Sequence, residues 1–185
     1  MAGAKHPRLN VGPSASFPPV LGRAPRVLIL GTMPGQRSLD EQQYYAHPRN
    51  SFWWIMEQAF GLDHRAPYAD RIHELQKLPV ALWDVLASCV RPGSLDSDIQ
   101  RNSEIPNNIS CLLVSNPSVV TVLCNGQAAA TLFRRHILPT LADDVKARIE
   151  LRAMPSTSPA YAAMGRDEKA AQWLAALNEA GVLGA

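Results

Sequence analysis

The chain has 185 residues, 46% of them hydrophobic and 18% charged, which suits one domain with a sizeable core and is ordinary for a globular protein. Eighteen Lys and Arg against sixteen Asp and Glu leave a net charge of +2, which neither demands nor excludes a polyanionic partner and confines any nucleic-acid contact to a local patch. The three cysteines form no C-x-x-C pair and the five histidines show no ligand spacing, so no metal site or iron–sulfur cluster is predicted.

Residues 1–16 are predicted to be a loose tail. They are rich in Pro, Gly, Ser and Ala and lack the apolar period of a helix or strand. We therefore expect a single domain over residues 17–185. The amino terminus has no apolar stretch of the signal-peptide kind, and no apolar run approaches the roughly 20 residues that a membrane helix needs. These features predict a cytoplasmic protein without membrane contact.

The first predicted strand covers residues 27–30. It is a continuous apolar run closed by Gly31, as in a strand buried on both faces of a parallel sheet. A long loop then leads to a helix over residues 51–60, whose apolar side chains recur at helical spacing and which Gly61 ends. A second helix is expected over residues 68–78.

The rest of the chain alternates in the same way. Strands are predicted over residues 80–86, 119–124 and 149–154, and helices over residues 105–115, 127–138 and 167–180. This alternation predicts a parallel sheet covered by helices on both faces, with right-handed crossovers. The loops that follow the strands then emerge at one edge, where open α/β sheets bind their ligands.

Polar and aromatic residues follow all four predicted strands, and we expect them to converge at that edge: Met33, Tyr45, Asn50, Asp84, Asn125 and residues 156–161. The chain has no Ser-His-Asp set and no G-x-x-x-x-G-K-[ST] or G-x-G-x-x-G motif. The G-T-M-P-G segment lacks the lysine that would hold a phosphate. Nucleotide hydrolysis is therefore not expected.

The chain contains, in this order, the segments G-T-M-P-G, Y-Y-A-H-P-R-N-S-F-W, L-W-D-V-L, G-S-L-D-S-D-I, L-C-N-G-Q-A-A and M-P-S-T-S-P-A. Together they resemble the uracil-DNA glycosylase superfamily, and most closely its hypoxanthine-DNA glycosylase branch. The similarity covers residues 18–177. It implies an α/β fold, a three-layer α/β/α sandwich around a four-stranded parallel sheet. It also implies a monofunctional DNA glycosylase of base-excision repair that needs no cofactor and no metal. We expect it to act as a monomer on DNA that contains a damaged base.

One departure from the superfamily concerns the catalyst. Relatives that remove uracil place Asp or Asn in the G-x-x-P-G loop to orient the attacking water, whereas this chain has Met33, which cannot hydrogen-bond a water usefully. In the hypoxanthine branch the resemblance assigns that role to the Asn of Y-Y-x-H-P-R-N, here Asn50. Cleavage through an oxocarbenium-like sugar needs little base strength, so a neutral amide suffices. Asn before a helix is also a favoured N-cap, and both roles can coexist.

The resemblance also predicts how the flipped base is held. Tyr45 is expected to stack on it, as an aromatic does in relatives. Asp84 is expected to read the base edge, although a buried Asp at a strand end more commonly holds backbone amides. Further base contacts are expected from the loop after the first strand, at Thr32, Met33 and Gly35.

The P-S-T-S-P segment resembles a superfamily motif that enters the minor groove and grips phosphates through hydroxyls and main-chain N–H groups. The predicted DNA contacts are therefore Ser156, Thr157, Ser158 and Pro159, together with His47 and Arg49. A simple Ser/Pro turn is the alternative for this segment. Asn125-Gly126 is expected to be a turn rather than a contact.

These residues predict an enzyme that hydrolyses the N-glycosidic bond of hypoxanthine in DNA. A mismatch uracil or xanthine glycosylase is the alternative within the same class. The alternative from another class is a catalytically silent protein that senses lesions, having lost the acid at the position of Met33.

Overall fold

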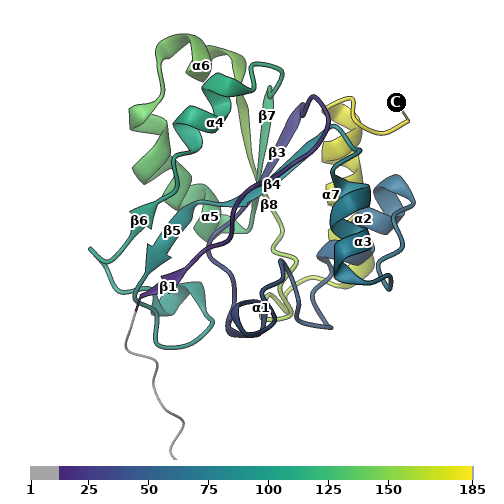
Figure 1. Cartoon of the computed structure of the whole chain (residues 1–185), viewed down its shortest axis with the longest axis horizontal. Coiled ribbons are helices and arrows are strands. Elements are labelled where there is room, and N and C mark those ends of the chain that lie inside the picture. The colour runs from purple at the N-terminus through teal and green to yellow at the C-terminus, as the bar shows by residue number, and fades with distance from the viewer. Residues whose placement is uncertain (1–12, 185) are drawn as a thin grey trace, which may run out of the picture.

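The computed structural model describes residues 13–184, in which helices flank a central sheet on both sides (Figure 1). The strands are β1 (Ser14–Ala15), β2 (Val20–Leu21), β3 (Val27–Gly31), β4 (Val80–Asp84), β5 (Leu86–Cys89), β6 (Ile105–Pro106), β7 (Thr121–Asn125) and β8 (Glu150–Met154). The α-helices are α1 (Gln36–Glu41), α2 (Phe52–Phe60), α3 (Tyr68–Leu75), α4 (Ile109–Ser115), α5 (Gln127–Leu132), α6 (Asp143–Arg148) and α7 (Arg166–Glu179). Shorter helical segments are the 3-10 helices η1 (Asp96–Asp98) and η3 (Leu138–Thr140) and the π-helix η2 (Phe133–Ile137). No helix of these described residues has the length and apolar character to cross a membrane.

The central sheet has the strand order β2-β4-β3-β7-β8. Strands β4, β3, β7 and β8 run parallel, which confirms the predicted four-stranded parallel sheet. The short β2 adds an antiparallel edge strand beside β4. A second, antiparallel sheet has the order β1-β5-β6. The sequence did not predict these short strands, because two to four residues are too few to show a period.

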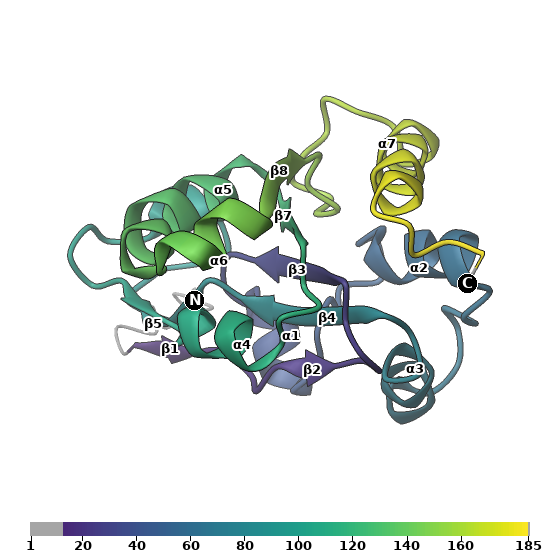
Figure 2. The ribbon, with the colours of Figure 1, turned by 90° about the horizontal axis from the view of Figure 1, so that it is seen from above.

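Side chains of the central strands alternate between two cores. In β3, Val27 and Ile29 belong to one hydrophobic cluster and Leu28 and Leu30 to the other, and all four side chains are fully buried. The first cluster takes in α2, α3 and α7, and the second takes in α4, α5 and η2. Figure 2 shows α2, α3 and α7 on one side of the sheet and α5 and α6 on the other. The continuous apolar runs of the sequence therefore reflect strands covered on both faces.

Some predicted elements have different bounds in the structure. The strand expected over residues 80–86 is divided between β4 and β5, which belong to different sheets. The helix expected over residues 105–115 begins at Ile109, because Ile105–Pro106 pairs with β5 and the Asn108 side chain accepts from the Cys111 N–H at 3.1 Å as a cap. The helix expected over residues 127–138 becomes π-helical after Leu132. Helices α1 and α6 were not predicted.

The loose tail was predicted over residues 1–16, of which residues 1–12 lie outside the described residues. Residues 13–16 of the predicted tail are part of the folded structure. Strand β1 pairs with β5, placing Ser14 opposite Cys89 and Ala15 opposite Ser88. Pairing of this kind uses main-chain groups, so it leaves no apolar pattern by which the sequence could reveal it.

The strand order creates a topological switch point between β3 and β7. From β3 the chain continues to β4 on one side, and from β7 it continues to β8 on the other. The loops that leave β3 and β7 therefore diverge and leave a crevice at the carboxyl ends of the strands. Ligands of open α/β sheets bind in such a crevice.

Candidate active site

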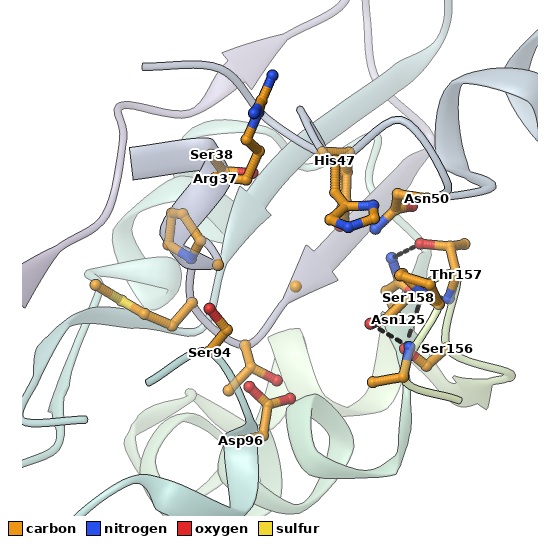
Figure 3. A pocket seen from close by; sticks show the side chains of 18 of the residues that line it. Arg37, Ser38, His47, Asn50, Ser94, Asp96, Asn125, Ser156, Thr157 and Ser158 are labelled. Carbon is orange, nitrogen blue, oxygen red and sulfur yellow. Dashed lines mark hydrogen bonds between the residues drawn. The ribbon is translucent and has the colours of Figure 1, made fainter. Parts of the chain in front are cut away.

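A cavity of about 430 Å³ lies at the carboxyl ends of the parallel strands (Figure 3). It is formed by the loop after β3, the end of β4, the segment around η1, the end of β7 and the loop after β8. The lining residues are 31–38, Tyr44, Tyr45, His47, Asn50, Asp84, Ser94, Leu95, Asp96, Asn125 and 156–161.

Every predicted site residue except Arg49 lines this cavity. Arg49 is exposed, and its main-chain N–H donates to His47 Nδ1 at 3.1 Å. Ser94, Leu95 and Asp96 were missed as site residues, although they lie in G-S-L-D-S-D-I, one of the segments that resembles the superfamily. That resemblance was the available signal for them.

Asp84 ends β4, and its carboxylate lies against Gly31 at the end of β3. A Cβ on Gly31 would lie 2.3 Å from Asp84 Oδ1 and 3.2 Å from Tyr45 Oη. Any larger residue would push the carboxylate or the phenol away. The glycine that closes the first strand is therefore required by close approach of these side chains.

The Asp84 side chain is almost wholly enclosed. The residue is 3% exposed, and its Oδ2 accepts a hydrogen bond from Ser16 Oγ at 2.9 Å. Burial raises the pKa of Asp84 to about 7, although the Ser16 hydrogen bond acts in the opposite direction. Among the described residues no backbone amide donates to this carboxylate. The alternative role expected from the sequence, in which a buried Asp at a strand end holds backbone amides, is therefore not observed.

Tyr45 combines a strained backbone with a buried hydroxyl. Its φ of 54° is left-handed, which is uncommon for a bulky residue, and its ring stacks on Phe52 with centroids 4.1 Å apart. Its Oη has no hydrogen-bond partner within the described residues, and burial raises its pKa above the ordinary value. Strain and an unpartnered polar atom occur together at functional sites.

Asn50 lies just before α2. The N-cap of this helix is Ser51, which makes no side-chain cap hydrogen bond, so Asn50 is not the cap residue that the sequence predicted. Asn50 Oδ1 still accepts from the N–H of Phe52, the first helical residue, at 3.0 Å. A carboxamide oxygen accepts two hydrogen bonds and the amide nitrogen donates two, so this hydrogen bond leaves groups free to hold a water. Figure 3 shows Asn50 beside His47, on the far side of the cavity from Asp96.

Asn125 and Thr157 form a two-point contact between β7 and the loop after β8. Asn125 Nδ2 donates to Thr157 Oγ1 at 2.9 Å, and the Thr157 N–H donates to Asn125 Oδ1 at 2.8 Å. Asn125 therefore makes a tertiary contact beside its place before the turn at Gly126. Thr157 is only 1% exposed, and its hydroxyl is engaged in holding this loop.

Helix α7 holds the two ends of the same loop. Trp173 Nε1 donates to the Pro155 carbonyl at 3.0 Å. The buried Lys169 donates through Nζ to the carbonyls of Ser158 at 3.1 Å and Tyr161 at 2.8 Å. These contacts fix the main chain that presents Ser156 and Ser158 to the cavity.

The segment around η1 is held by a buried cation. The Arg91 guanidinium is enclosed, donates to the Pro34 carbonyl and lies 3.5 Å from Asp96 Oδ1. The Gln36 N–H donates to Ser94 Oγ at 3.0 Å. The G-T-M-P-G loop and the η1 segment therefore form one wall of the cavity.

Met33 and Gly35 have different places in that wall. Met33 is 6% exposed and packs in the hydrophobic cluster beneath the cavity, so its thioether provides a surface without a useful water ligand. A Cβ on Gly35 would meet no atom within 4 Å, so the main chain there is open to a ligand.

The chain belongs to the uracil DNA glycosylase superfamily, because the model of that family matches residues 18–180. It is similar to the hypoxanthine DNA glycosylase of Methanosarcina barkeri (strain Fusaro / DSM 804), with 38% identity over 112 residues, 60% of this chain and 70% of that protein. It is also similar to the hypoxanthine DNA glycosylase of Methanosarcina acetivorans, with 35% identity over 61% of this chain and 71% of that protein. A solution structure of a candidate uracil DNA glycosylase from Methanosarcina acetivorans has a TM-score of 0.73 and 28% sequence identity, covering 92% of this chain and 99% of that chain.

The family membership defines the class of enzyme. The chain is a DNA glycosylase, which hydrolyses the N-glycosyl bond between a base and its deoxyribose. The cavity lies at the switch point, where open α/β sheets bind their ligands.

Proposed function

We propose that this glycosylase excises hypoxanthine from DNA and that Asn50 positions the attacking water. The proposal is supported above all by one observation: Asn50 and Asp84 line the same cavity, while Met33 stands where an acid or amide would serve in uracil-removing relatives. Two relatives that are named hypoxanthine DNA glycosylases agree with this assignment. The retained amide favours an enzyme over a silent lesion-binding protein.

Asn50 is suited to a reaction that needs orientation more than base strength. Departure of the base leaves an oxocarbenium-like sugar, and a water held by a neutral amide can attack that cation. The hydrogen bond from the Phe52 N–H fixes the Asn50 carboxamide before substrate binds. No lysine is among the described residues that line the cavity, which favours water over an amine as the nucleophile.

Asp84 is suited to selecting hypoxanthine over adenine. Hypoxanthine presents N1–H as a donor, whereas adenine presents N1 as an acceptor. An ionised Asp84 accepts from the first and repels the second, and buried groups left unpaired or repelled discriminate strongly. Tyr45, stacked on Phe52, offers its aromatic face to the purine.

The strand that carries the lesion is held by the rim of the cavity. Ser156, Ser158 and Pro159 belong to a loop fixed from behind by α7, and His47 and Arg49 lie on the loop before α2. Hydroxyls and main-chain N–H groups of this kind position a phosphate backbone without reading sequence. Thr157 contributes by holding the loop.

A panel of duplex oligonucleotides tests the substrate. Each duplex contains one hypoxanthine, uracil, xanthine or ethenoadenine, and alkali cleaves the strand wherever a base has been lost. Hypoxanthine should be released fastest under single-turnover conditions. Faster release of uracil or xanthine would assign the enzyme to that lesion, and binding without release of any base would assign it to the lesion-sensing class.

A further inference from the structure

Ser16 reaches the cavity from a part of the chain that precedes the central sheet. Its hydroxyl donates to Asp84 Oδ2 at 2.9 Å across 68 positions of sequence. Its main-chain N–H donates to the Ala87 carbonyl at 2.8 Å, directly after the pairing of β1 with β5. The next residue, Phe17, accepts through its carbonyl from Trp83 Nε1 at 3.0 Å. The main chain is therefore fixed on both sides of Ser16, and the hydroxyl is held in place.

We propose that Ser16 is a positioning residue for base recognition, which holds one oxygen of Asp84 so that the other faces the purine as a hydrogen-bond acceptor. This inference rests on the proposed function, in which Asp84 reads the base. Asp84 Oδ1 lies on the side of Gly31, where the absence of a Cβ leaves room for it. With Oδ2 bonded to Ser16, Oδ1 is the carboxylate oxygen without a hydrogen-bond partner in the described residues.

The other charged and titratable groups around Asp84 do not replace Ser16. Arg91 and Asp96 face it from the η1 segment, and their charges act on Asp84 in opposite directions. Arg91 is itself engaged with the Pro34 carbonyl and with Asp96. Tyr44 and Tyr45 face it from the loop before α2. The Tyr44 hydroxyl is within hydrogen-bond distance of two main-chain carbonyls, and that of Tyr45 has no partner in the described residues. Within residues 13–184, Ser16 thus makes the one hydrogen bond to the Asp84 carboxylate.

This hydrogen bond bears on which purine is accepted. A hydroxyl that donates to a carboxylate favours its ionised form, whereas burial favours the protonated form. A protonated Asp84 has an O–H that can donate to adenine N1, so discrimination is lost when the proton is bound. Ser16 therefore extends to lower pH the range in which Asp84 accepts from hypoxanthine and rejects adenine.

The test is the pH profile of a Ser16→Ala variant. Single-turnover excision from a hypoxanthine duplex and binding to an undamaged A·T duplex are measured from pH 5.5 to 9.5. The acid limb of excision should move up by about one pH unit, which lowers the rate about fivefold at pH 7 and leaves it near wild type at the alkaline end. Binding to undamaged duplex should tighten at pH 7. Ser16→Thr keeps the hydroxyl and should restore the profile, and Ser16→Cys, with a weaker donor, should be intermediate.

Two controls separate positioning from folding. Ser14→Ala alters the same strand, but the Ser14 hydroxyl makes no hydrogen bond within residues 13–184, so its profile should match wild type. In an Asp84→Asn background, Ser16→Ala should no longer shift the pH profile, since Asn does not titrate. A loss of excision rate that is equal at every pH, or a shift of the pH profile that persists in the Asp84→Asn background, would reduce Ser16 to a structural residue and overturn the inference.

The failure of the inference is distinguishable from failure of the proposed function. If wild type releases hypoxanthine but Ser16→Ala has the wild-type profile, the inference is wrong and the proposed function stands. If wild type does not release hypoxanthine, the proposed function itself fails. If Ser16→Ala lowers the melting temperature too far to assay, the Ser16→Cys and Ser16→Thr profiles decide the question, and identical profiles for the two overturn the inference.

Discussion

At the residue scale, the site depends on side chains that bond one group of the protein and keep a second polar group free for the reaction. Asn50 bonds the main chain of α2 and leaves groups free for a water, and Asp84 bonds Ser16 and leaves one oxygen toward Gly31. In each case the structural partner fixes the geometry that the chemistry needs. Substitutions at these positions should therefore alter catalysis more than folding.

Replacing Asn50 by Ala should abolish excision while leaving the protein folded. Loss of the hydrogen bond from the Phe52 N–H should cost about 1 kcal/mol of stability, as for other side-chain hydrogen bonds. The excision rate should fall by far more than tenfold, the equivalent of about 1.4 kcal/mol in the barrier. Thermal unfolding and single-turnover kinetics on one preparation measure both effects. A soluble variant that cuts within tenfold of wild type would remove Asn50 from the catalytic role.

Replacing Asp84 by Asn should weaken discrimination between purines. Asn keeps an acceptor for hypoxanthine N1–H but adds a donor that adenine N1 can use. We expect slower hypoxanthine excision and tighter binding to undamaged A·T duplex, measured by kinetics and by titration with labelled DNA. Unchanged discrimination would move base reading to the main chain of residues 32–35.

Asp84 should also make stability depend on pH. Its pKa is about 7 in the folded protein against an ordinary value of 3.8, so the folded state binds a proton that the unfolded state has released between these values. The free energy of unfolding should therefore fall as pH rises from about 4 to about 7, by up to the order of 4 kcal/mol for this group. The free energy of unfolding of the Asp84→Asn variant should lack this decline, so the variant should become more stable relative to wild type as pH rises. Denaturant unfolding at several pH values checks this, and parallel curves for the two proteins would contradict it.

At the element scale, α7 serves the site without lining it. Lys169 and Trp173 bind the carbonyls of the loop after β8, while Asn125 on β7 binds Thr157 within it. The loop is thus held by a helix on one side and by a strand on the other. Its serines are presented on a rigid main chain, which lowers the cost of ordering them on DNA.

Lys169→Met should therefore weaken DNA binding more than it slows chemistry. It removes both hydrogen bonds to the Ser158 and Tyr161 carbonyls and keeps most of the side-chain volume. We expect about tenfold weaker binding, equivalent to about 1.4 kcal/mol, with the rate at saturating enzyme changed less than about threefold. The control is Lys77→Met, since Lys77 pairs with Glu74 on the surface. Wild-type affinity for the Lys169 variant would show that the loop does not need this anchor.

At the scale of the whole molecule, positive and negative charges are nearly balanced. We therefore expect DNA binding to depend on the residues at the rim of the cavity. The net charge is +2, and Arg37 and Arg49 are exposed near the cavity. One of them, Arg37, is paired with Glu41. A protein with this distribution contacts few phosphates.

The affinity for DNA should accordingly depend only modestly on salt. The slope of log affinity against log salt concentration is about 0.9 for each phosphate neutralised, so a few contacts predict a slope of roughly 2 to 4. Binding titrations between 50 and 300 mM salt measure it. A slope near 10, as for a large basic repressor, would mean that the footprint extends well beyond the cavity rim.

The sequence alone determined the layers of the fold and the edge at which the site lies. Continuous apolar runs such as residues 27–30 and helical periods such as residues 51–60 are local patterns, and burial imposes them wherever the element packs. Its ordered motifs also indicated the family and eleven of the residues that line the cavity. Only the tertiary structure decided the contacts that hold those residues: Ser16 on Asp84, Asn125 on Thr157, Arg91 on Pro34 and Lys169 on the loop after β8. Each joins a polar side chain to a group distant in sequence, through a hydrogen bond that depends on the path of the folded main chain and leaves no period in the sequence.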